Sequence, residues 1–391
     1  MGTHHTRSAR SPMPRPLRRL TRLALPTALL VAAACATAGA PGEAVPAATP
    51  ASGAVAGAPA QPASSWPVRT REHVDLWLHG FALVVDDTAR VPIFRRGYRE
   101  AMRARKARAN AFTQLDAERD RLRQRLAANP ALALNAQFVA LAFPSWEVLR
   151  AAAEAFVQAG GDPRRASDQQ TAAAIQFLAG IFPTVGDREF LRLFTAALQD
   201  ERERFYHQEW LALQRDRATA LAAADSVWQR ALRPRLGRFL SGTQQTGGDL
   251  LLSPVIGGEG RTQAGGSRSN VVVVTFPARA ADAAEAGYVA AHELTGTLVG
   301  SIVSDNTSPA DQRAGVADRL VSAGQVRAGY LLLAQGAPEL APGYARYYLQ
   351  EAGVAAPARG GEGAALAAAF PLPPGILEAI TRQLEVVRGG I

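Results

Sequence analysis

Cysteine, lysine and long apolar runs are nearly absent from this sequence of 391 residues. Its single cysteine excludes a fold held together by intrachain disulfide bonds, and no apolar run is long enough for a polytopic membrane protein. The only lysine is Lys106, so the other basic side chains are arginines. Together with 35 Gly and 25 Pro, this bias is typical of a GC-rich genome and says little about binding partners. The length predicts one large domain or two.

The positive charge is concentrated near the N-terminus. The formal net charge is +9, and residues 1–34 hold six arginines and no acidic residue, so the rest of the chain is only mildly basic. These arginines, the apolar residues 23–34 and the small residues that follow have the three-part layout of an export signal. The apolar stretch is shorter than the ~20 residues of a transmembrane helix, and Pro26 interrupts it. The charge therefore predicts export rather than an acidic partner.

The only cysteine, Cys35, lies where this apolar stretch ends. The small residues 31–34 and Cys35 resemble the lipobox of bacterial lipoproteins, in which the cysteine is acylated. Ala32 stands where lipoboxes usually have Leu, so ordinary cleavage after Ala38 or Ala40 is the alternative. Acyl chains on Cys35 would hold the protein on a membrane leaflet, because each buried methylene contributes ~0.8 kcal/mol. We expect a lipid-anchored protein of the bacterial cell envelope, and otherwise a periplasmic or secreted one.

Composition divides the rest of the chain into three parts. Residues 35–65 are almost wholly Ala, Pro, Gly, Thr and Ser, and we expect a tether because they cannot bury enough apolar surface to fold. Apolar residues at helical spacing predict a helical region over 66–245, with helix starts at Asn129 and Ser145. Residues 246–391 form the third part, in which the pattern changes.

Two short apolar runs mark that change, Leu-Leu-Leu at 250–252 and four valines at 271–274. They flank a Gly-rich polar connection and predict a small antiparallel strand pair. Helical spacing then predicts further helices, near 281–304, 309–335, 339–352 and 374–388. The predicted fold class is α+β and predominantly helical, with a helical array followed by a small sheet and more helices.

A basic run over residues 95–108 is the one feature that would suit nucleic acid. Its charges surround the predicted helix rather than forming one stripe, and no aromatic residues interleave with them for base stacking. An exported protein also rarely meets nucleic acid. We therefore interpret the run as a solvated helix face and expect no nucleic-acid partner.

The segment over residues 287–300 is the most informative about chemistry. His292 and Glu293 begin an HExxH pattern, in which two histidines four residues apart share a zinc ion and the glutamate is the general base. Gly296 stands where the second histidine would be. Close packing of helices would explain Gly296 equally well, so the neighbouring sequence has to decide.

That sequence resembles gluzincin metallopeptidases in three respects: the preceding strand pair, the helix directly after it, and a segment over residues 340–348. Gluzincins commonly place their third zinc ligand in a helix reading Leu-x-Glu-Gly-x-Ala-x-Tyr. Leu340, Gly343, Ala345 and Tyr347 match this register, and Pro342 replaces the glutamate. The resemblance covers residues 247–352 and implies a zincin-like domain that has lost two of its three ligands, at Gly296 and Pro342.

A chain with one such ligand is expected to be a pseudoenzyme without zinc, because its site lacks the ligands that hold the metal and acidify its water. The resemblance then implies a binding or scaffolding role, with an extended peptide or an envelope protein in the groove between the strand edge and the His292 helix. The alternative is an active zinc metallohydrolase with Glu293 as base and His292 as ligand.

That alternative requires substitute ligands, for which the sequence offers four candidates: Asp305, Glu339, His79 and His207. His79 lies in an apolar helical segment, where a hydrogen-bonded core histidine is the usual explanation. His207 follows Glu203 by four residues and suits an exposed helix pair. No G-x-S-x-G motif supports a serine hydrolase.

Overall fold

The computed structural model describes residues 66–357 and 360–389. The predicted export signal, the predicted acylation site Cys35 and the predicted tether lie outside the described residues. Within them the fold is predominantly helical, with one four-stranded mixed sheet, so the predicted α+β class is confirmed. No helix of the described part is both long enough and apolar enough to cross a bilayer.

Helices dominate the chain from residue 72 to residue 242. They are α1 (Glu72–Val84), α2 (Tyr98–Arg108), α3 (Gln114–Ala128), α4 (Pro130–Ala136), α5 (Trp146–Gln158), α6 (Gln169–Ile181), α7 (Val185–Glu201), α8 (His207–Asp216), α9 (Ala218–Ser226) and α10 (Arg233–Gly242). The predicted starts at Asn129 and Ser145 are confirmed, because these side chains accept hydrogen bonds from the backbone N–H groups of Leu132 and Val148. One π-helical segment (Arg202–Tyr206) joins α7 to α8, and another (Val227–Leu232) joins α9 to α10.

The sheet has the order β1-β2-β4-β3, with β1 (Val68–Arg69), β2 (Gly248–Ser253), β3 (Arg261–Gln263) and β4 (Asn270–Thr275). The two predicted runs do pair, with Leu250 opposite Val272, but β2 and β4 run parallel, so the predicted antiparallel pairing is wrong. The connection over 254–269 is long enough for a crossover. Within it β3 forms and takes the antiparallel position beside β4.

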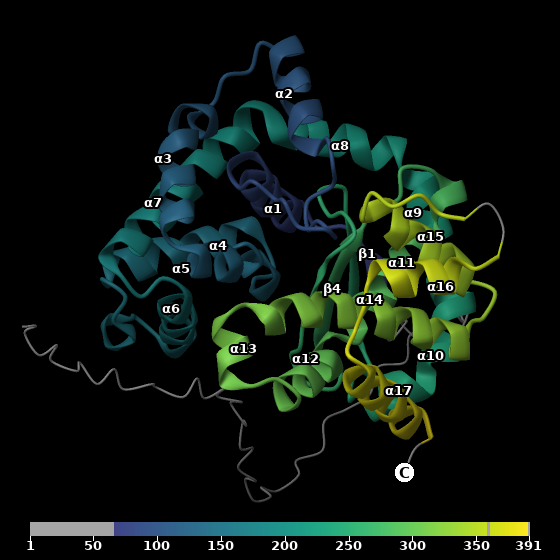
Figure 1. Cartoon of the computed structure of the whole chain (residues 1–391). Coiled ribbons are helices and arrows are strands. Elements are labelled where there is room, and N and C mark those ends of the chain that lie inside the picture. The colour runs from purple at the N-terminus through teal and green to yellow at the C-terminus, as the bar shows by residue number, and fades with distance from the viewer. Residues whose placement is uncertain (1–65, 358–359, 390–391) are drawn as a thin grey trace, which may run out of the picture. The chain divides into compact units, whose positions relative to one another are not determined.

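Side chains of β2 and β4 alternate between two hydrophobic cores. Leu251 and Val273 lie in the first core, which is built mainly from α1 to α7. Leu250 and Val272 lie in the second core, with residues of α9, α10 and the helices after β4. Both faces of these strands are therefore covered, which explains why their sequences are continuous apolar runs rather than alternating ones. Figure 1 shows the sheet between the early helices and the green to yellow helices of the C-terminal part.

The helices after β4 are α11 (Ala284–Leu294), α12 (Gly296–Asp305), α13 (Pro309–Arg313), α14 (Val316–Gly336), α15 (Ala341–Glu351), α16 (Glu362–Ala369) and α17 (Pro374–Gly389). Helix α11 packs against β4, α14 and α15. The second core also contains Trp66 and residues of α9 and α10. All of these precede residue 245, so the second core extends across the predicted boundary.

The basic run lies largely on α2, as expected, with Arg103 and Arg108 exposed to solvent. Lys106 is the exception, because only 4% of it is exposed. Its ammonium group contacts Glu201, Asp116 and the Thr113 hydroxyl, at 2.6, 2.5 and 2.9 Å. The interpretation as a solvated face is therefore wrong at Lys106, where a compact cation neutralises two carboxylates inside the protein.

Candidate functional site

His292 and Glu293 lie together in the second core. The His292 ring nitrogen Nδ1 is 2.9 Å from Glu293 Oε1, which also accepts a hydrogen bond of 2.8 Å from the backbone N–H of Gly260. The exposed fractions of His292 and Glu293 are 1% and 5%. A Cβ atom at position 260 would overlap the carbonyl oxygen of Val273, so only glycine lets this N–H approach the carboxylate.

The other nitrogen of His292 has no such partner. Nε2 is buried and makes no hydrogen bond to any described residue. The ring is stacked on Tyr348 of α15, with centroids 5.3 Å apart and an interplanar angle of 17°. Because the Glu293 carboxylate accepts a hydrogen bond from Nδ1–H, Nε2 of the neutral ring carries the lone pair that a general base uses. No hydroxyl, amine or thiol of the described residues is placed to be deprotonated there.

Gly296, the position of the missing histidine, begins α12 rather than continuing α11. A Cβ atom at this position would come within 2.8 Å of the amide nitrogen of Gln325 on α14. This amide is the end of a flexible side chain, so a larger residue at 296 would displace it rather than meet fixed backbone. Glycine at 296 therefore leaves room for Gln325 beside α12.

Pro342, the position of the missing glutamate, is exposed in the first turn of α15. The face of α15 that meets α11 carries Tyr344 and Tyr348, four residues apart, and both are fully buried. Gly343 lies directly under the Tyr288 hydroxyl, which explains why it is glycine. Tyr348, rather than residue 342, thus reaches His292, and only its helical spacing from Tyr344 marks it in the sequence.

Each of the four candidate substitute ligands is either paired with another residue or exposed at the surface. The exposed Glu339 pairs with Arg235, and His207 pairs with Glu72 at 2.9 Å. His79 is buried in the first core against Glu201, and Asp305 is exposed at the end of α12.

Catalytic zinc sites use three protein ligands plus an open position. In residues 66–357 and 360–389, no three His, Cys, Asp or Glu side chains gather as a metal-binding group. Around His292 the described residues place one imidazole and the carboxylates of Glu293 and Glu259, with His292 Nδ1 engaged by Glu293. As placed, these side chains do not form the three-ligand set of a catalytic zinc site.

An acidic cavity of about 470 Å³ lies beside this pair. Its wall includes Glu293, Glu259 next to β3, and Asp318 on α14, with Arg261 as the one basic side chain. The guanidinium of Arg261 lies over the Phe138 ring, 4.7 Å from its centroid. Burial raises the pKa of Glu259 to about 7, and the negative charge of Glu293 acts in the same direction against the opposing effects of His292 and Arg261.

A second cavity of about 590 Å³ lies further along β3, between α12, α17 and the loop before β4. The two cavities share the lining residues Thr262 of β3 and Thr297 of α12, so they meet at these side chains. Thr262 is fixed there because its hydroxyl donates to the carbonyl oxygen of Glu293. We call the two cavities together the β3 groove.

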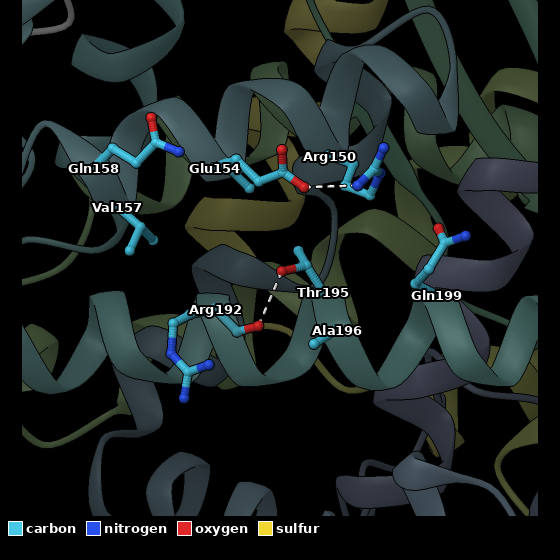
Figure 2. A pocket seen from close by; sticks show the side chains of 9 residues that line it. Arg150, Glu154, Val157, Gln158, Arg192, Thr195, Ala196 and Gln199 are labelled. Atoms are coloured by element: carbon cyan, nitrogen blue, oxygen red, sulfur yellow. Dashed lines mark hydrogen bonds and ion pairs between the residues drawn. The ribbon is translucent and has the colours of Figure 1, made fainter.

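Another hollow, of about 460 Å³, lies between α5 and α7 in the first half of the chain (Figure 2). Its polar groups already have partners within the protein. Arg150 pairs with Glu154 at 2.7 Å, and the Thr195 hydroxyl donates to the carbonyl oxygen of Leu191 at 2.8 Å. The charged side chains of the hollow are therefore paired with one another or with neighbouring residues.

Comparison with models of protein families, with curated proteins and with solved structures found no match to this chain. The site thus has to be interpreted from its own residues. The sequence predicted His292, Glu293 and the position of Gly296. It did not point to Glu259, Asp318, Gln325 or Tyr348, which come from a loop and two helices and have no local motif.

Proposed function

We propose that this chain is an exported protein of the cell envelope that binds an extended peptide segment in the β3 groove without hydrolysing it. The observation that carries the proposal is the position of β3. It is an edge strand of the sheet, and no other strand of the described residues pairs with the side away from β4. Exposed strand edges offer unpaired N–H and C=O groups that an incoming peptide can use.

The groove supports the same proposal. A peptide that adds a strand needs main-chain partners along an edge and pockets for alternate side chains. Cavities of about 470 and 590 Å³ lie along β3 and meet at Thr262 and Thr297. Their combined extent suits several residues of extended chain better than one compact molecule.

Binding without hydrolysis follows from the resemblance to gluzincins and from the site's present contacts. Gly296 and the exposed Pro342 carry no side-chain atom that can bind a metal ion. His292 and the Gly260 N–H both contact Oε1 of Glu293, so this oxygen is not free to activate a water molecule. These contacts favour the pseudoenzyme over the metallohydrolase.

Random heptapeptides displayed on phage would be selected against the purified protein, and the enriched sequences measured by fluorescence anisotropy. Thr297 is exposed where the two cavities meet, so Thr297→Trp should weaken binding at least tenfold by filling the groove. Ser304→Trp is the matched control, because Ser304 is exposed on the same helix and lines neither cavity. Failure to enrich any peptide, or equal binding by both variants, would contradict the proposal.

Metal analysis separates this proposal from the active metallohydrolase. The purified protein should contain no stoichiometric zinc and should bind none at micromolar excess. Stoichiometric zinc that disappears in a His292→Ala variant would instead establish the enzyme. His207→Ala is the control, because His207 pairs with Glu72 elsewhere in the chain.

The anchor has a separate test, because Cys35 lies outside the described residues. Cys35→Ser should release the protein from the membrane fraction of expressing bacteria into the soluble fraction, since the acyl chains would be lost. Membrane association that is unchanged in this variant would contradict lipidation while leaving the peptide groove untouched.

A further inference from the structure

Gln245, a residue that lines the second cavity of the β3 groove, carries a buried hydrogen-bond acceptor that no described residue satisfies. Gln245 lies in its wall and is 8% exposed. The side-chain oxygen Oε1 of Gln245 is buried and has no hydrogen-bond partner among the described residues. A buried acceptor without a donor is costly, so each such atom in a protein calls for an explanation.

The orientation of the Gln245 amide is fixed by its other contacts. Its Nε2 donates to the carbonyl oxygen of Leu294 at 3.3 Å, so turning the amide over would place two acceptors against each other. The backbone is held as well, because the N–H of Gln245 donates to Leu240 and its carbonyl accepts from the Trp66 indole. The free acceptor is therefore built into the fold.

The rest of the cavity is uncharged except at one point. Its wall carries hydroxyl and carboxamide side chains, aliphatic side chains from α11 and α12, and one carboxylate, Asp305. No Lys, Arg or His lies among its lining residues, so nothing there would neutralise an anion. Thr297, Ser301 and Gln383 are exposed and make no side-chain hydrogen bond within the described part of the chain. They remain available to a polar ligand.

We propose that this cavity is the subsite for an uncharged carboxamide side chain, of Gln or Asn, on the peptide bound along β3. Its N–H group donates to Gln245 Oε1, and its aliphatic stem packs on Leu294 and Leu298. This inference rests on the proposed peptide groove and specifies what the groove selects. A hydroxyl side chain could also donate, but it has no long aliphatic stem and a single hydrogen to offer.

An isostere series on the unaltered protein tests the inference. A heptapeptide from the phage selection is scanned with Gln, Lys, Glu and Leu at each position, and binding is measured by fluorescence anisotropy. At one position Gln should bind at least tenfold more tightly than Glu or Leu, because Glu is repelled by Asp305 and Leu leaves Oε1 unpaired. Equal binding of the four peptides at every position, or tighter binding of Lys than of Gln at that position, would overturn the carboxamide subsite and leave the groove standing.

The variant Gln245→Leu removes the acceptor and should reduce the Gln preference to less than about twofold while the Leu peptide still binds. Its fold is checked by circular dichroism. A second measurement needs neither this variant nor a peptide: the Gln245 side-chain amide resonance should shift when N-acetylglutamine amide is added. N-acetylglutamate and N-acetylleucine amide should leave it unchanged. No shift, together with no peptide binding, would overturn both the subsite and the groove.

Discussion

The described part of the chain contains two buried histidine–glutamate pairs, one beside each core. In the first core, His79 contacts Tyr98 through Nδ1 at 2.9 Å and Glu201 through Nε2 at 3.1 Å. The second carboxylate oxygen of Glu201 contacts Lys106 and Thr113. In the second core, His292 contacts Glu293 through Nδ1, but its Nε2 has no hydrogen-bond partner in the described part of the chain.

The two pairs show that the same residue types can stabilise the fold in one place and stay available to a ligand in another. Burial alone would raise the pKa of Glu201, but hydrogen bonds and charges from His79 and Lys106 lower it to about 2. A carboxylate so completely paired stabilises the fold and has nothing left to offer a ligand. The pair in the second core lies beside a cavity that contains further carboxylates and is only partly satisfied. We expect a ligand to bind where polar groups of the protein still lack hydrogen-bond partners.

The largest predicted effect tests the first pair. Glu201→Gln should lower the free energy of unfolding by about 3–5 kcal/mol, because it leaves Lys106 buried with a weaker set of partners. Glu203→Gln, at an exposed position two residues later, should change it by less than about 0.5 kcal/mol. Urea unfolding followed by circular dichroism measures both. Equal effects would mean that the network contributes no particular stability.

Asp75 is a buried acid for which no ion pair is found among the described residues, and it extends the comparison to the pH dependence of stability. Burial raises the pKa of Asp75 from 3.8 to about 7, although the Trp210 indole donates to it at 2.9 Å. Because the folded state binds the Asp75 proton more tightly than the unfolded chain does, this protonation stabilises the fold fully below pH 4. The stabilisation is lost as pH rises to 7. The loss is on the order of a few kcal/mol.

Asp75→Asn should make this decline smaller when unfolding is measured at several pH values from 4 to 8, and the part that remains is expected from Glu259, whose pKa is also raised to about 7. The pH dependence that Glu201 contributes has the opposite sign. Its lowered pKa stabilises the fold above the unfolded pKa of 4.5, and this contribution disappears as pH falls towards 2. An unchanged pH profile in Asp75→Asn would show that Asp75 does not carry the proton.

Matched substitutions of the two histidines compare the pairs directly. His79→Phe should cost about 2–3 kcal/mol, because Tyr98 and Glu201 each lose a buried partner. His292→Phe should cost less than about 1 kcal/mol, because Nε2 has no hydrogen-bond partner to lose and Glu293 keeps the Gly260 N–H. Thermal and urea unfolding measure the difference, and a larger cost at His292 would reverse the assignment of roles.

The last prediction concerns the only lysine, Lys106. Lys106→Arg should lower stability by about 1–2 kcal/mol, although the charge is kept, because a planar guanidinium is larger than the ammonium that meets three oxygen atoms here. Arg103→Lys on the exposed side of the same helix is the control and should be neutral. Unfolding by urea distinguishes the two variants.

Local signals predicted the helices well and the sheet less well. Caps such as Asn129 and Ser145 act on neighbouring backbone groups, so their effect is visible in the sequence. Strand direction depends on the path of the connection between Leu252 and Val271, which is why parallel pairing was missed. The continuous apolar runs themselves are typical of parallel strands with both faces buried.

The sequence by itself determined the predominantly helical fold and the adjacency of His292 and Glu293. Only the tertiary structure decided what these side chains meet: Tyr348, Gly260 and, at position 296, Gln325. It also decided that Lys106 is buried and that Gln245 keeps a free acceptor. The physical reason is distance along the chain, because periodicity and caps act over one helical turn, whereas a site is assembled by packing elements that are remote in sequence.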